Sequence, residues 1–350
     1  MILSTLDKSR KGGAYEQIPS LVLGQRWTPQ LNSRNMMKVV LCVWIEPYIE
    51  NDLSFCVWPV HTPTTSKEVL TLSASTSPLP YTGNKSCIVN TILSVMPKHT
   101  VYIDPCMGSA EVFFRKPRAE KEILNDYNGD LVNLFRVIQN NEKLAYLLGR
   151  LYLSINGELA FKQNKDRLKG VPNILDDVIE TSQIFYDASW EDIQNAAAFL
   201  ENQVYSFLHR PNLRNRQEGY VAKTASFDER LRDAIILHRD YKDVITYAAC
   251  PGSFILLDPP YKGTEDMYSK ANFDIEQHDI LFSFMSEVNQ QHHGEVKFLI
   301  TYNNDPYIRG VAEKHGFDTF VQTRLHSMKQ SKEAGALYEE LLIANYDLEK

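Results

Sequence analysis

Short apolar runs of strand length alternate with stretches whose apolar residues recur at helical spacing over most of the chain. The predicted strands lie at residues 101–103, 122–124, 234–237, 254–257, 297–301 and 339–346. The predicted helices lie at residues 85–96, 131–138, 280–288 and 307–315. Because strands that alternate with helices form a parallel sheet covered on both faces, the pattern predicts an α/β, doubly wound, Rossmann-like fold.

Two stretches do not follow this alternation. Residues 142–225 have mostly helical spacing with polar turns, and we interpret them as an inserted, mainly helical domain. Residues 1–76 contain strand-like runs at 38–45 and 53–60 and end in a stretch rich in Ser, Thr and Pro, which is typical of a linker. The predicted domains are therefore an N-terminal extension and linker at 1–76, an α/β domain at 77–141 and 226–350, and an insertion at 142–225.

Composition and charge narrow the classes of partner and site. The chain has 350 residues and a net charge of −7, so it lacks an overall basic field, and contact with nucleic acid would need a local patch. Its five cysteines are widely spaced without a CxxC pair, which favours a reducing, cytoplasmic location and predicts neither a disulfide framework nor a metal site. Since no apolar run reaches membrane-spanning length, we expect no membrane contact.

Polar residues at the ends of the predicted strands indicate a nucleoside site. Asp104 follows the first strand, and Gly108 in the next turn would let a ligand approach the backbone closely. Asp126 follows the second strand about 20 residues later, where an acid can accept hydrogen bonds from ribose hydroxyls. The same residues also suit a plain turn and a helix cap. In a doubly wound sheet the first and fourth strands are neighbours, so Asp258, after a later strand, would face the same crevice.

Asp258-Pro259-Pro260-Tyr261 directly follows the apolar run at 254–257. Prolines at a strand exit stop further pairing and fix how the chain leaves the sheet, so a simple turn is one interpretation. The other is a catalytic site, because the Asp258 carboxylate and the Pro259 carbonyl could each accept one N–H bond of a nucleobase amine and free its lone pair. Tyr261 could then stack on a base that has left the duplex.

These motifs occur in the order found in the Dam-type (alpha-class) S-adenosylmethionine-dependent N6-adenine DNA methyltransferases, which residues 80–346 resemble. The resemblance also rests on Tyr81-Thr-Gly-Asn-Lys85, His238-Arg-Asp-Tyr241 and the ending at 340–346. It implies S-adenosyl-L-methionine as the cofactor. The residues that it places at the cofactor are Tyr81, Gly83, Lys85, Asp104, Gly108, Asp126, Asp240, Tyr241 and Asp258. The residues to which it assigns catalysis are Asp258, Pro259, Pro260 and Tyr261.

Two positions depart from the family pattern. Asn84 stands where glycine is usual, and Gly108-Ser109-Ala110 contains fewer glycines than most members have.

A locally basic stretch closes the predicted insertion. Arg210, Arg214 and Arg216 lie together there, with tyrosines among them. Runs of charge usually form solvated faces, but the resemblance places a target-recognition domain in this insertion. Because arginine suits both phosphates and guanine edges, we expect these three residues to contact double-stranded DNA.

The resemblance thus implies a site-specific DNA adenine N6-methyltransferase, with a cognate restriction endonuclease as a candidate partner. Two alternatives stay open. One is a methyltransferase acting on another amine, such as cytosine N4 or an RNA adenine, although Asp at the position of Asp258 is typical of the adenine enzymes. The other is a non-catalytic DNA-binding relative, against which Lys85, Asp126, Asp258 and Tyr261 all count.

Overall fold

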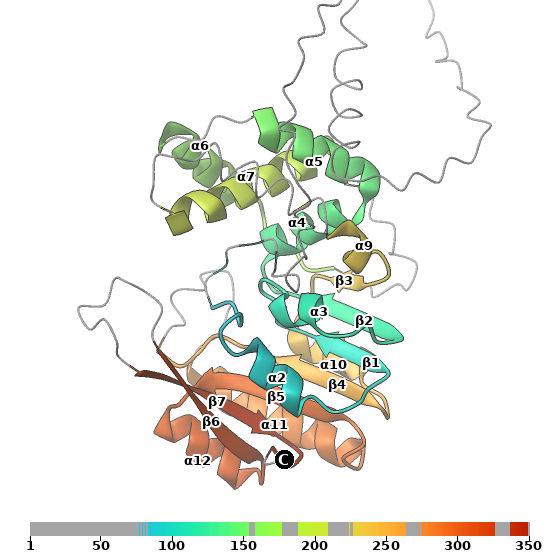
Figure 1. The fold of residues 1–350 in the computed structure, drawn as a ribbon, viewed down its shortest axis with the longest axis vertical. Coiled ribbons are helices and arrows are strands. Elements are labelled where there is room, and N and C mark those ends of the chain that lie inside the picture. Colours follow the sequence, from blue (N-terminus) through green and yellow to red (C-terminus); the bar gives the residue numbers. More distant parts are fainter. Residues whose placement is uncertain are drawn as a thin grey trace, which may run out of the picture.

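The computed structural model describes residues 77, 79, 81, 83–153, 158–176, 188–208, 224, 227–263, 273, 275–325 and 337–348. Its centre is a seven-stranded sheet with the strand order β3-β2-β1-β4-β5-β7-β6 (Figure 1). The strand-like runs at 38–45 and 53–60, the linker, and Arg210, Arg214 and Arg216 lie outside the described residues.

The sheet is mostly parallel. Its strands are β1 (Val101–Asp104), β2 (Lys121–Asn125), β3 (Ile235–Leu237), β4 (Ser253–Leu257), β5 (Lys297–Asn303), β6 (Asp318–Leu325) and β7 (Leu337–Ala344). Strands β1 to β5 pair in parallel, whereas β7 runs antiparallel between β5 and β6. The predicted doubly wound α/β fold is confirmed. Strand β6 was missed because it is an edge strand whose side chains at 318–323 are never fully buried, so no apolar run marks it.

Strand β1 lies between β2 and β4, where the direction of winding reverses. Every residue of β4 is buried, as expected for a central parallel strand, and Ile255 pairs with Ile103 of β1. Both strands therefore end at the same edge of the sheet. Asp104 and Asp258 therefore lie at neighbouring strand ends, as predicted.

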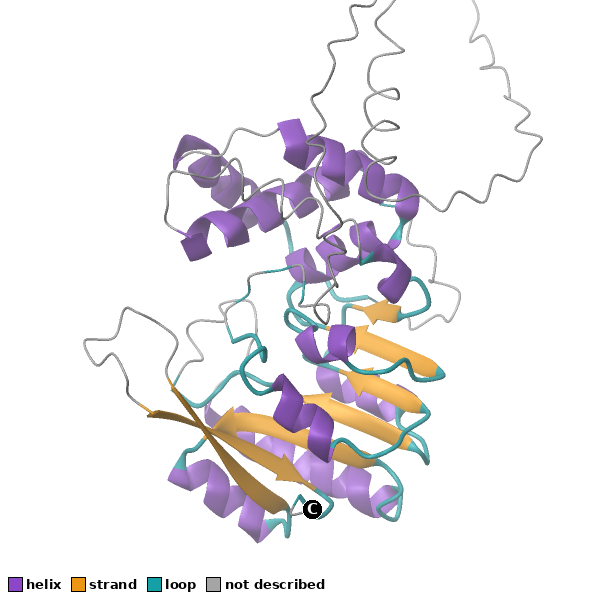
Figure 2. Cartoon of the chain, in the orientation of Figure 1, coloured by secondary structure: helices purple, strands orange, loops and turns teal. Residues whose placement is uncertain are grey.

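Helices cover both faces of the sheet (Figure 2). One face carries α2 (Val89–Val95), α3 (Glu111–Arg115) and α4 (Gly129–Gln139), and the other carries α10 (Tyr241–Ala248), α11 (Ile275–Gln291) and α12 (Pro306–Lys314). Alternate side chains of the strands point to opposite faces of the sheet. Tyr102 and Phe254 pack in one apolar cluster, and Ile103 and Ile255 pack in the other. All four predicted helices are confirmed, with ends shifted by a few residues.

Three helices form the described part of the region predicted as an insertion: α5 (Asn141–Leu153), α6 (Glu158–Lys169) and α7 (Trp190–Leu208). They pack above α4, at the β3 end of the sheet (Figure 1). The chain returns through α9 (Asp228–Leu231).

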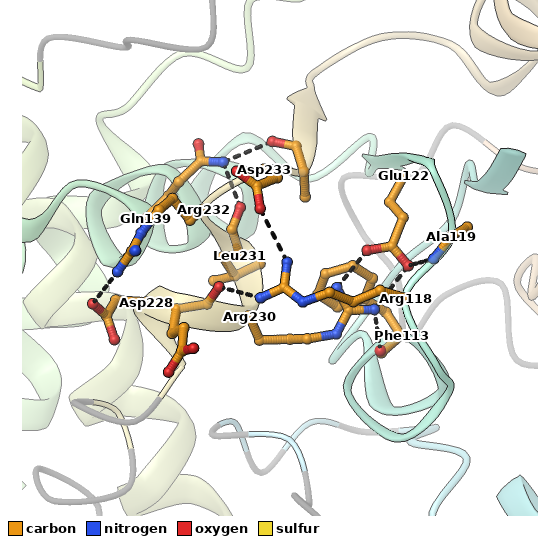
Figure 3. Close-up of polar contacts among 12 residues, drawn as sticks. Phe113, Arg118, Ala119, Glu122, Gln139, Asp228, Arg230, Leu231, Arg232 and Asp233 are labelled. Carbon is orange, nitrogen blue, oxygen red and sulfur yellow. Dashed lines mark hydrogen bonds and ion pairs between the residues drawn. The ribbon is translucent and has the colours of Figure 1, made fainter. Parts of the chain in front are cut away.

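Arg230 on α9 reaches back to strand β2 (Figure 3). Its guanidinium forms a two-point ion pair with the buried Glu122 and donates a 2.9 Å hydrogen bond to the Phe113 carbonyl. The fully buried ammonium of Lys116 lies 2.5 Å from the same Glu122. Removing any one of these charged side chains would leave a buried charge uncompensated. The cluster therefore holds α9 against strand β2.

The chain enters the α/β domain beside the loop that follows β1. The Ser77 N–H donates to the Glu111 carboxylate at 2.8 Å, and the Ser77 hydroxyl donates to the Ser109 carbonyl at 2.5 Å. The residue that directly follows the predicted linker is therefore fixed to the loop that carries Gly108.

Candidate active site

A cavity that is partly open to solvent lies at the carboxyl ends of β1, β2 and β4. The predicted site residues that line it are Tyr81, Gly83, Lys85, Asp104, Gly108, Asp126, Asp240, Tyr241, Asp258 and Pro260. Two further predicted residues, Pro259 and Tyr261, belong to the same motif but do not line the cavity.

The loop after β1 brings its backbone close to the cavity. Gly108 has a φ of +49°, in the left-handed region that glycine tolerates, and a Cβ there would lie 3.7 Å from the Tyr81 ring. The Gly108 N–H donates to the Asp126 carboxylate at 3.0 Å. The loop after β1 and the acid after β2 therefore form one unit, beneath an aromatic ring.

Two acids at this edge, the buried Asp104 and the half-buried Asp126, have raised pKa values. Burial raises the pKa of Asp126 to about 6, although the backbone N–H groups of Asn128 and Gly108 oppose the shift. Burial also raises the pKa of Asp104 to about 8, despite a 2.9 Å hydrogen bond from the Tyr102 hydroxyl. At neutral pH Asp126 is therefore mostly ionised, and Asp104 is mostly protonated.

Asn125 joins the loops around the cavity. Its buried side-chain amide donates to the Pro105 carbonyl at 2.8 Å and to the Arg239 carbonyl at 2.9 Å, and it accepts from the Arg239 N–H at 2.8 Å. It thereby fixes the loop after β3 to the loop after β1. Asp240 then caps α10 by accepting from the Lys242 N–H. The sequence marks Asn125 only as the neighbour of Asp126, so its linking role was not predicted.

Asp258 is held by two side chains. The Lys85 ammonium lies 2.5 Å from one carboxylate oxygen, and the Thr301 hydroxyl donates to the other at 2.7 Å. Burial raises the pKa of Asp258, whereas the charge and hydrogen bond of Lys85 lower it. Its side chain stays 24% exposed, so the carboxylate is accessible from the cavity. Lys85 therefore favours the ionised form of an acid that burial alone would protonate.

Tyr261 lies beside Asp258 and is fixed from two sides. Its ring packs against the buried Tyr302 ring at 5.7 Å between centroids, and its hydroxyl donates to Glu340 at 2.8 Å. The Lys85 ammonium lies 5.0 Å from the centre of its ring. Burial and the charges of Asp258 and Glu340 raise the pKa of Tyr261 well above its usual value, so the hydroxyl stays protonated and can donate.

The two departures from the family pattern have different local consequences. Asn84 does not have a positive φ, so glycine is not needed there, and its side chain accepts hydrogen bonds from the Ser86 N–H and hydroxyl. Ala110, by contrast, has a φ of 53°, which costs an alanine on the order of 1 kcal/mol.

Other residues that line the cavity were not predicted as site residues from the sequence. Phe273 and Gln277 line the cavity from the segment after the Asp-Pro-Pro-Tyr motif and from the start of α11. Tyr127 and Arg239 line it from the loops after β2 and β3. Within the described ranges, no group of three or more His, Cys, Asp or Glu side chains could hold a metal ion. None of the helices that the structure describes is long and apolar enough to cross a membrane.

The sequence profile of the D12 class N6 adenine-specific DNA methyltransferases matches residues 81–331. The chain belongs to this family. The predicted activity, N6-adenine methylation of DNA, is thereby confirmed at the level of the family. The matched stretch covers the cavity loops, the region of the helical insertion and the Asp-Pro-Pro-Tyr motif of the methyltransferase.

The methyltransferase is similar to proteins of archaea, phages and bacteria. It is 26% identical over 300 residues to the type II methyltransferase M.MjaIII of Methanocaldococcus jannaschii, covering 77% of this chain and 98% of that protein. It is 26% identical over 255 residues to the DNA N-6-adenine-methyltransferase of Escherichia phage P1, covering 68% of this chain and 31% of the phage protein. Modification methylase StsI of Streptococcus sanguinis is 26% identical over 238 residues, which are 64% of this chain and 35% of StsI.

Proposed function

We propose that the methyltransferase transfers a methyl group from S-adenosylmethionine to N6 of a flipped adenine at a specific site in double-stranded DNA. The observation that carries this proposal is that one cavity contains both the Gly108–Asp126 unit and the Asp258 carboxylate. The first suits a nucleoside cofactor and the second suits an amine. A methyl donor and a methyl acceptor could therefore meet inside one cavity.

The residues around the cavity fit this cofactor. Asp126 is an acid at the end of the second strand, placed to accept hydrogen bonds from ribose hydroxyls. Gly108 has no side chain between its backbone and the cavity, and Tyr81 offers an aromatic face above it. Asp240 and Tyr241 complete the adenosine side. When bound, S-adenosylmethionine supplies an activated methyl group on its sulfonium sulfur.

Asp258 and the Pro259 carbonyl are proposed to orient the target amine. The Asp258 carboxylate and the Pro259 carbonyl are both hydrogen-bond acceptors, and each would accept one N–H bond of the adenine amino group. The nitrogen lone pair is then free to face the methyl carbon, which is a positioning effect. Lys85 and Thr301 fix the Asp258 side chain, and Lys85 favours its ionised form by lowering a pKa that burial raises. An ionised acceptor strengthens the bond that it forms with the amine.

Tyr261 is proposed to be the surface on which the flipped adenine stacks. Its ring is backed by Tyr302, and its hydroxyl is anchored by Glu340. Because the Tyr302 ring and the Glu340 carboxylate already restrain the Tyr261 side chain, little conformational freedom is lost when the base stacks on it. Glu340 does not touch the base in this scheme, because its role is to position Tyr261.

The helical region at 142–225 is proposed to recognise DNA, with residues 77–141 and 226–350 as the catalytic domain. Arg210, Arg214 and Arg216 would contact phosphates or base edges. The names of two relatives, a type II methyltransferase and a modification methylase, support a cognate restriction endonuclease as a partner. Action on DNA also supports a cytoplasmic location.

Calorimetry with S-adenosylmethionine in the presence of a metal chelator tests the cofactor proposal. We expect one binding site per chain, a large loss of affinity in Asp126→Ala, and nearly full affinity in Asp258→Ala. Failure of the wild-type protein to bind S-adenosylmethionine would contradict the proposed cofactor. Binding that chelation removes and one metal restores would contradict the metal-free site.

A further inference from the structure

The described helical region contacts the cavity loops directly through a short segment after α6. This bridging segment, residues 173–176, lies against the loop after β2 and the loop after β3. Tyr127 and Arg239, which line the cavity, belong to these two loops. The chain connections at α5 and α9 do not by themselves require such a contact.

Asn173 forms the contact with the loop after β2. Its amide N–H donates to the Tyr127 carbonyl at 2.9 Å, and its amide oxygen accepts from the Gly129 N–H at 2.8 Å. The fit is close, because a Cβ on Gly129 would lie 2.9 Å from the Asn173 amide oxygen and 2.8 Å from the His238 ring. Asn173 therefore fixes the backbone just after Asp126.

Asp176 forms the contact with the loop after β3. Its N–H donates to the His238 carbonyl at 2.8 Å, and its carboxylate accepts from the His238 N–H at 2.9 Å. Its carbonyl accepts from the Arg239 guanidinium at 2.6 Å, and the Arg136 guanidinium lies 2.7 Å from its carboxylate. The backbone just before Asp240 is thereby held as well.

The bridging segment is joined to the rest of the helical region through α6. Asn164 donates to Glu201 of α7 at 2.7 Å, and Arg167 donates to Asn195 of α7 at 3.2 Å. A displacement of α6 and α7 would therefore also move residues 173–176, which lie a few residues after the end of α6. Neither Asn173 nor Asp176 lines the cavity, so any effect on a ligand must act through the loops.

We propose that Asn173 and Asp176 are positioning residues that couple the helical region to cofactor binding. They hold the backbone that presents Asp126 and Asp240, so DNA contact by the helical region and S-adenosylmethionine binding influence each other. By thermodynamic linkage, the factor by which DNA changes cofactor affinity equals the factor by which cofactor changes DNA affinity. The proposal rests on the function proposed above, in which this region binds DNA and this cavity binds the cofactor.

Calorimetric affinity for S-adenosylmethionine tests the proposal, using wild-type protein, Asn173→Ala and the matched control Asn164→Ala. Both variants remove one asparagine amide from the helical region, but only Asn173 contacts a cavity loop. We expect roughly tenfold weaker binding in Asn173→Ala, since two hydrogen bonds are lost, and a change below about twofold in Asn164→Ala. Gly129→Ala, which inserts a methyl group between Asn173 and His238, should act like Asn173→Ala.

The same variants are then titrated with a duplex that carries the methylated sequence found by single-molecule sequencing. The factor by which this duplex changes cofactor affinity should move towards one in Asn173→Ala. Asn164→Ala is the control for cofactor affinity without DNA only, because the bond from Asn164 to Glu201 joins α6 to α7. The methylation rate at saturating cofactor should stay near that of wild type in both. Wild-type cofactor affinity and coupling in both Asn173→Ala and Gly129→Ala would overturn the inference and leave the proposed function intact. A wild-type protein that binds no cofactor would overturn the proposed function itself.

Discussion

The hydroxyl of Tyr261 donates a 2.8 Å hydrogen bond to Glu340, a residue 79 positions later in the chain. Tyr261 ends the Asp-Pro-Pro-Tyr motif, whereas Glu340 lies on β7, the antiparallel strand between β5 and β6. Strand β7 thus fixes the aromatic side chain that ends the motif. This bond gives the last strand a role in the proposed mechanism.

A double-mutant cycle tests that role. Tyr261→Phe and Glu340→Gln should each slow single-turnover methylation by about tenfold, because each weakens a hydrogen bond to a charged group. The double variant should be no slower than Tyr261→Phe, since the two side chains act through one bond. Losses that multiply in the double variant would show that Glu340 acts independently of the Tyr261 hydroxyl. Tyr261→Ala, which also removes the ring, should be slower than Tyr261→Phe.

Lys85 should set the lower pH limit of methylation. Burial raises the pKa of Asp258 and Lys85 lowers it, so removal of the ammonium raises the pKa further. The ionised carboxylate is then lost at a higher pH as the solution is acidified. In Lys85→Met, the acidic limb of the single-turnover rate should therefore move to higher pH. The rates are measured at saturating cofactor, and an unchanged limb would contradict the role of the ion pair.

Asp126 should make cofactor affinity depend on pH. Its pKa is raised to about 6 by burial, and ribose hydroxyls donate preferentially to the ionised form. Affinity for S-adenosylmethionine should therefore be full above pH 6 and fall as the pH decreases below it. Calorimetry from about pH 5 to about pH 8 measures this step. Asp126→Asn should abolish the step, whereas Asp104→Asn should keep it, because the pKa of Asp104 lies higher, at about 8.

Much of the fold could be predicted from the sequence because buried parallel strands are continuous apolar runs. Residues 253–257 are buried throughout, and the acid that follows them is visible without a structure. The cavity residues near strand ends were predictable for the same reason. Strand β6 was not, because its polar and half-buried residues give no clear period.

The contacts that support the site were largely hidden in the sequence. Asn173 and Asp176 act through backbone atoms of loops that lie far away in the chain, and nothing in their own neighbourhood indicates a partner. Glu340 follows Glu339 in a strand of otherwise mostly apolar residues, where a pair of acids suggests an edge rather than a link to Tyr261. Phe273 and Gln277 line the cavity although they belong to no motif. Such relationships depend on tertiary packing, which local patterns do not record.

The basic stretch should contribute to DNA affinity. A variant with Arg210, Arg214 and Arg216 all changed to alanine should bind duplex DNA more weakly. Each lost phosphate contact should reduce the slope of log affinity against log salt by about one. A contact to a base edge should instead cost roughly 1–3 kcal/mol at one position of the site. Normal binding by the triple variant at several salt concentrations would show that the stretch is only a solvated face.

Methylation of duplex DNA by purified wild-type protein and Asp258→Ala, read by single-molecule sequencing, tests the central claim most directly. The wild-type protein with S-adenosylmethionine should produce N6-methyladenine in one sequence context. Asp258→Ala should produce none while keeping most of its cofactor affinity, and Asp258→Asn should fall between them because it retains one carbonyl acceptor. Near-normal N6-methyladenine from Asp258→Ala, or N4-methylcytosine from the wild-type protein, would contradict the proposed site.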